Sequence, residues 1–169
     1  MNDFQPEDVG NTLQIITDML VNLSTDFFAF LVVAGVIAAF AFYFGRDRIV
    51  PLVAALYASI PLFMFFPYDT TPYGGVIVTL ALWLGFVLLS MIAFSGLAAF
   101  IASGSIGLIK LVALSAATAG LVLAIAINIL PVEQVYTFSA PTKALFDTPE
   151  MFFLWLAAPL IGIFFFSRG

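Results

Sequence analysis

Few polar side chains lie within the apolar stretches of this sequence, where they could carry chemistry. Asp26, Lys110 and Asn128 each fall near the end of such a stretch, and no charge falls at the middle of one. A charge at the centre of a membrane helix usually marks an ion path or a proton relay. We expect Asp26 to be a helix N-cap or first-turn acid where a span begins, and Lys110 to reach the headgroups. An ion-coupled transporter is therefore disfavoured.

The residue types that most enzymes need are largely missing. The chain contains no histidine and no cysteine, and so lacks the common zinc ligands, the usual general base and any thiol nucleophile. The acids Glu133, Asp147 and Glu150 fall in one polar stretch, 132–150, which we interpret as a solvated loop. Residues 104–107 lack the Lys-Ser/Thr pair and the strand of a phosphate-binding loop. We expect a protein that is not an enzyme and that binds neither metal nor cofactor.

The composition places the chain in a lipid environment. Hydrophobic residues make up 63% of its 169 residues and charged residues 9%, against about 45–50% and about 25% in soluble domains. So little polar surface cannot cover a soluble domain of this size, and the mean hydropathy is +1.17. The net charge of -5 and the pI of about 4.2 exclude the basic footprint of a nucleic-acid-binding protein.

Turns rich in glycine, proline and charge divide the chain into apolar stretches close to the roughly 20 residues that a membrane helix needs. We predict an all-α polytopic bundle over residues 26–169. The five predicted transmembrane helices are 27–44, 49–66, 75–94, 108–130 and 151–166. The small-residue segment 95–107 is either a short turn, which could dip into the protein interior, or part of a long third helix.

Basic residues set the expected orientation, because lysine and arginine gather on the inner side of a membrane. With the N-terminus outside and the C-terminus inside, only Lys143 of the five basic residues lies outside. The inner topology anchors are then Arg46, Arg48, Lys110 and Arg168.

The first 25 residues are acidic and do not resemble a secretory signal, which needs a basic start. Their apolar residues recur at helical spacing, which is typical of an amphipathic helix on the outer membrane surface. Docking of this helix on the outer loops or on a partner is an equal alternative. The apolar positions are Leu13, Ile16, Met19, Leu20 and Leu23.

Small residues four positions apart recur in three of the predicted spans. This spacing lets two helix backbones approach closely, and such packing holds membrane helices together. Any bundle of this size needs such seams, and one of them could instead bind another protein. Pro61 and Pro159 fall inside predicted spans and should bend them. The seam residues are Ala34 and Ala38, Ala81 and Gly85, and Ala116, Gly120 and Ala124.

Two segments resemble the colicin V production protein family of small bacterial inner-membrane proteins. One is Phe44-Gly45-Arg46-Asp47-Arg48, and the other is Gly104-Ser105-Ile106-Gly107-Leu108-Ile109-Lys110 before a long small-residue span that ends at Pro131. The resemblance covers about residues 27–145. It departs from the family in the added outer segment, in the fifth span and at Leu111, where another glycine is expected. It implies a role in envelope maintenance or export and carries over no catalytic residue.

We therefore expect a non-enzymatic, multi-pass plasma-membrane protein of the bacterial inner membrane. Its expected role is that of a scaffold or accessory subunit in a secretion or envelope-maintenance process. Its partners would be the lipid bilayer and other membrane proteins or further copies of itself, and not nucleic acid. The alternative is a small channel, holin or uncoupled transporter formed by an oligomer, and a lipid-handling role is a third possibility.

Overall fold

The computed structural model describes residues 6–67, 75–96 and 107–166, and every regular element in these ranges is helical. The predicted all-α class is confirmed for this part of the chain. The main helices are α1 (Pro6–Phe44), α2 (Ile49–Met64), α3 (Gly75–Ser95), α5 (Leu108–Asn128), α6 (Ala140–Phe146) and α7 (Pro149–Phe166), and the short 3-10 helices are η1 (Arg46–Arg48) and η3 (Val132–Gln134).

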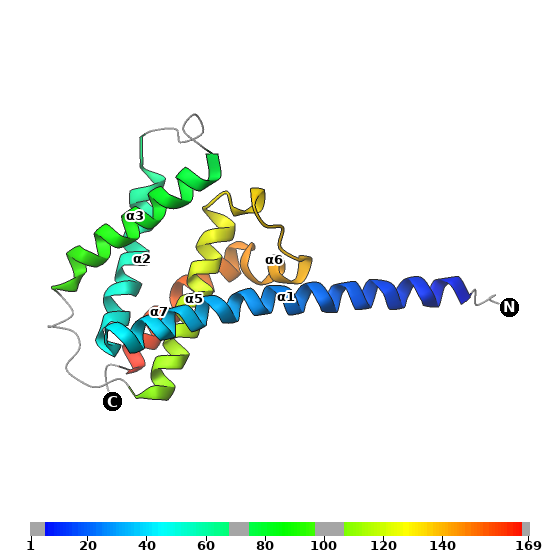
Figure 1. Ribbon diagram of the computed structural model, residues 1–169, viewed down its shortest axis with the longest axis horizontal. Helices are drawn as coiled ribbons and strands as arrows, with labels where there is room; N and C mark the ends of the chain where they lie inside the picture. Colours follow the sequence, from blue (N-terminus) through cyan, green and yellow to red (C-terminus); the bar gives the residue numbers. More distant parts are fainter. Residues whose placement is uncertain (1–5, 68–74, 97–106, 167–169) are drawn as a thin grey trace.

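Helix α5 lies at the centre of the fold and contacts α1, α2, α6 and α7 (Figure 1). Of its apolar span, 56% of the residues are buried, against 22% in α3 and 11% in the apolar part of α1. Leu111, Leu114, Leu121 and Ile125 of α5 are almost wholly buried. Helices α1, α2, α6 and α7 therefore pack around α5, and α1 and α3 turn large apolar faces outward, as expected for a protein in lipid.

Helices α2 and α3 form an antiparallel pair at one side of the molecule (Figure 1). Trp83 and Val87 of α3 join one buried cluster with Ala55 and Leu56 of α2. Leu121 and Ile125 of α5 belong to the same cluster and connect the pair to the rest of the fold. Helix α3 is therefore an outer helix with one covered face.

Helix α1 runs for 39 residues without interruption, and its N-terminal part extends well beyond the other helices (Figure 1). Pro6 stands at its first position, where proline is tolerated, and no further proline occurs before Pro51. The helix ends before Gly45, whose φ of 108° few other residues adopt. Residues 6–25 are thus continuous with the first predicted span; whether they lie on a membrane surface stays a prediction.

Three helices in the described ranges are long and apolar enough to cross a membrane: Thr25–Phe44, Gly75–Ser95 and Leu108–Asn128. Helices α6 and α7 meet at a bend of 63° and together would make a fourth span. Helix α2 is apolar but has only 16 residues. Five spans therefore remain a prediction beyond the three to four that length and composition support. Helix α3 ends at Ser95, and residues 97–106, on which the turn or re-entrant segment was predicted, lie outside the described residues.

Candidate functional site

Asp26 is the centre of a polar cluster that joins α1 to the segment before and within α6. Its side chain is 6% exposed. Oδ1 accepts a hydrogen bond from the Tyr136 hydroxyl at 2.6 Å. Oδ2 accepts from the Ser139 amide at 2.9 Å, from the Ser139 hydroxyl at 2.6 Å and from the Thr142 hydroxyl at 2.6 Å. Both carboxylate oxygens are therefore well satisfied by neutral donors.

The prediction that Asp26 caps the beginning of a helix is wrong. Asp26 lies in the interior of α1, 20 residues and so more than five turns after Pro6. No proline or other strong breaker separates 6–25 from the first span, so the helix continues through the expected cap. The carboxylate instead accepts hydrogen bonds from residues that come more than a hundred positions later in the chain.

Tyr136 contributes both a polar and an apolar contact to the cluster. Its ring packs edge-on against Phe138, with 4.9 Å between the centroids, and Phe138 is buried among Ala124 and Ile127 of α5. The hydrogen bond to the Asp26 carboxylate raises the pKa of the Tyr136 phenol, since the phenolate could not donate it. The contact therefore requires the neutral phenol.

Asn128 and Trp155 hold the last turn of α6. The Asn128 side-chain amide donates to the Ala124 carbonyl at 2.9 Å and to the Phe146 carbonyl at 2.7 Å. The Trp155 indole donates to the Leu145 carbonyl at 3.0 Å, and its ring stacks on Phe146 at 5.0 Å between centroids. The final carbonyls of a helix have no partner within the helix, so α5 and α7 supply partners here.

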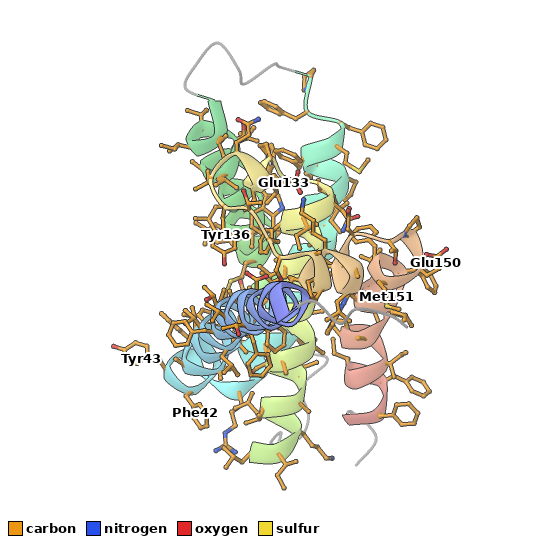
Figure 2. All side chains as sticks on the ribbon, turned by 90° about the vertical axis from the view of Figure 1, so that its right-hand side faces the viewer. Phe42, Tyr43, Glu133, Tyr136, Glu150 and Met151 are labelled. Atoms are coloured by element: carbon orange, nitrogen blue, oxygen red, sulfur yellow. The ribbon has the colours of Figure 1, made fainter. Side chains whose placement is uncertain are left out.

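The interpretation of residues 132–150 as a solvated loop is wrong for its middle part. Phe138, Thr142 and Phe146 are buried, and residues 140–146 form α6. Lys143 forms an ion pair with Glu133, and both side chains are partly exposed. Figure 2 shows Glu133 and Glu150 well apart from each other. The described residues bring no three acidic side chains together as a metal site would need.

The seam predicted in α5 is used inside the molecule. At Gly120, an added Cβ would lie 2.0 Å from Cε3 and Cζ3 of the Trp155 ring, so only glycine admits α7 at this distance. Ala124 is fully buried beside Phe138 and Phe146, and Ala116 is half-buried. This seam therefore packs α7 and α6 against the central helix.

The other two predicted seams differ from each other. In α1, Ala34 and Ala38 are half-buried, and Ala34 packs against the cluster formed with Ile49 and Leu111. In α3, Ala81 and Gly85 are exposed on the face away from α2, and none of the described residues lies within 4 Å of a Cβ built at Gly85. The α1 seam is thus partly covered, whereas the α3 seam is open.

Three of the four predicted topology anchors lie at one end of α5. Arg46 and Arg48 belong to η1, which leads into Ile49, and Lys110 is in the first turn of α5 before Leu111. Ile49 and Leu111 share one buried cluster, so the backbones that carry Arg48 and Lys110 are neighbours. Arg168 lies outside the described residues. Lys143 lies in α6, at the opposite end of α5.

Both prolines predicted to bend spans lie inside helices, Pro61 in the last turn of α2 and Pro159 within α7. Pro159 is fully buried and Pro61 is exposed. Because of its position, Pro61 affects the hydrogen bonds at the end of α2 rather than those at its middle. The bending of either helix stays a prediction.

Comparison with known proteins returned no match: no protein-family model, no curated protein and no solved structure is significantly similar to this chain. The resemblance to the colicin V production family consequently stays a prediction.

Proposed function

We propose that this chain is a non-enzymatic scaffold or accessory subunit of a plasma-membrane assembly, and that it binds another membrane protein through the outward face of α3. The process that it supports would be secretion or envelope maintenance, in line with the family resemblance. The observation that carries the proposal is the open seam at Ala81 and Gly85.

The contrast between two seams supports this role. At Gly120 an aromatic ring from α7 of the same chain fills the space of the missing Cβ, whereas at Gly85 no residue in the described ranges lies within 4 Å of that position. In lipid, close approach of backbones at small residues is a main source of helix association. Larger apolar side chains are exposed on the same helix and would add contact area beside Ala81 and Gly85: Ile77, Leu84, Leu88 and Ile92.

We further propose five spans, with the N-terminus outside and the C-terminus inside. The placement of Arg46, Arg48 and Lys110 at one end of α5 and of Lys143 at the other supports this orientation. Helix α2 would cross the bilayer despite its 16 residues, because a short span is accommodated by local thinning of the bilayer.

The test compares two glycine variants. Gly85→Leu fills the open seam, and Gly35→Leu makes the same change at an exposed glycine of α1 that also has open space around it. We expect Gly85→Leu to lose the partner that co-purifies from native membranes and Gly35→Leu to keep it. A photo-crosslinker at Leu84 should capture the same partner, whereas one at Phe153 of α7 should not.

A chain that elutes alone from gently solubilised native membranes and forms no crosslink at Leu84 would contradict the proposal. If the chain forms only a symmetric homo-oligomer that passes ions in proteoliposomes, the channel interpretation replaces it.

A further inference from the structure

The last turns of α1 carry a shallow apolar hollow on the outside of the molecule. Its volume is about 790 Å³, and it is lined by Val36, Ala39, Phe40, Phe42, Tyr43 and Phe44. Phe42, Tyr43 and Phe44 are 51%, 86% and 62% exposed. Phe42 and Tyr43 project away from the other helices in Figure 2. No described helix covers this surface.

The positively charged side chain of Arg46 lies beside the hollow. Gly45 turns the chain with its positive φ, and the Arg48 amide closes η1 by donating to the Gly45 carbonyl at 3.0 Å. The Arg46 guanidinium lies 5.6 Å from the centroid of the Phe42 ring, a cation–π distance. This contact places the positive charge beside an aromatic ring that lines the hollow. A guanidinium has five N–H donors and binds phosphate in a bidentate manner.

The depth of these features matches one leaflet. From Val36 to Phe44 the helix axis rises about 12 Å, less than half of the roughly 30 Å of hydrocarbon in a bilayer. Phe44 is the last residue of the apolar span and Arg46 follows in η1. The hollow therefore lies at acyl-chain depth, and the guanidinium lies at headgroup depth.

We propose that this corner of α1 and η1 is a binding site for one anionic phospholipid. The Arg46 guanidinium binds the phosphate, and an acyl chain lies in the hollow beside Ala39 and Phe40. The exposed Tyr43 places its hydroxyl at the interface, where it can donate to the headgroup. This site is separate from the α3 face of the proposed function.

The 3-10 geometry of η1 supplies a matched control. With three residues per turn, positions 46 and 48 point about 120° apart, and Arg46 is the one whose guanidinium lies over a ring that lines the hollow. Arg46→Gln and Arg48→Gln remove the same charge from the same turn. A specific site distinguishes between these variants, whereas diffuse attraction of anionic lipid to a basic loop does not.

The experiment measures lipid bound to the full-length chain in detergent by native mass spectrometry. The probes are phosphatidylglycerol, phosphatidylcholine with the same acyl chains, and glycerol phosphate without acyl chains. We expect one tightly held phosphatidylglycerol, and about tenfold weaker binding in Arg46→Gln. Arg48→Gln should retain most of the binding. Ala39→Phe, which fills the hollow and leaves both arginines in place, should also weaken it.

Equal losses in the two arginine variants would overturn the proposal, as would equal binding of the two phospholipids. Binding of glycerol phosphate as tight as that of the whole lipid would assign the site to a soluble phosphate and overturn the acyl-chain contact. Thermal melting of each variant in detergent checks that a loss of lipid does not come from unfolding.

Discussion

Asp26 and Thr142 are 116 residues apart in the chain, yet the Thr142 hydroxyl donates to Asp26 Oδ2 at 2.6 Å and both side chains are 6% exposed. This contact fastens α6 to the middle of the long helix α1. A buried carboxylate is costly unless its hydrogen bonds are made, and here Tyr136 and Ser139 complete the set. The polar cluster therefore determines where the segment after α5 returns to the bundle.

Removal of the Asp26 carboxylate should destabilise the fold more than removal of any one of its donors. We expect Asp26→Ala to lower the free energy of unfolding by about 2–4 kcal/mol, because it removes the acceptor of four hydrogen bonds, one of them from the buried Thr142. Thr142→Val removes one of these donors, while valine keeps the shape of the threonine side chain. This variant should cost about 1 kcal/mol. Thermal or denaturant unfolding in detergent measures both, and equal losses would contradict the central role of Asp26.

Alkaline pH should weaken the Tyr136 contact. The folded-state pKa of Tyr136 is raised above its usual value by the hydrogen bond to Asp26. The contact therefore contributes its full stability below about pH 10, the unfolded pKa, and loses it as the pH rises through the higher folded pKa. The stability difference between the wild type and Tyr136→Phe, followed from about pH 8 upward, should shrink only in the alkaline range. The other tyrosines titrate in both proteins, so their contribution to the pH dependence cancels when the two free energies of unfolding are subtracted.

Gly120 should tolerate no side chain, in contrast to Gly35. A methyl group at Gly120 would overlap the Trp155 ring, whereas one at Gly35 has open space. We expect Gly120→Ala to cost about 1–3 kcal/mol through overpacking, and Gly35→Ala to be neutral or slightly stabilising because alanine favours the helix. Melting temperatures compare the two. In a double-mutant cycle with Trp155→Leu, the penalty of Gly120→Ala should fall; an unchanged penalty would place its cause elsewhere.

Reversal of charge in η1 should disturb the orientation of the chain. Arg46→Glu with Arg48→Glu leaves Lys110 and Arg168 as the basic residues of the predicted inner side. We expect a partly inverted or unstable population, since the bias of lysine and arginine sets topology. A cysteine at the exposed Leu145 in α6 reports the side by its labelling, because the native chain has no cysteine. The control variant Arg46→Lys with Arg48→Lys keeps both positive charges. Its cysteine at position 145 should be labelled to the same extent as in the chain with the native arginines.

Much of the secondary structure follows from the sequence alone. The predicted span 108–130 matches α5 at Leu108–Asn128, and 75–94 matches α3 at Gly75–Ser95. Apolar stretches bounded by glycine, proline and charge have few alternatives to a helix in lipid, because every backbone polar group must be paired within the segment. The prediction failed for α6, whose seven residues are too few and too polar to stand out from a loop.

Only the tertiary structure decided what the polar and small residues do. Gly85 and Gly120 stand in the same four-residue spacing with alanine, yet one faces outward and the other receives Trp155. Asp26 resembles an ordinary helix-end acid in sequence, but its partners come from residues 136–142. Local spacing specifies a helix and its apolar face, because those depend on neighbours within about one or two turns. Which helix covers that face depends on how the whole chain returns through space, and no local pattern records it.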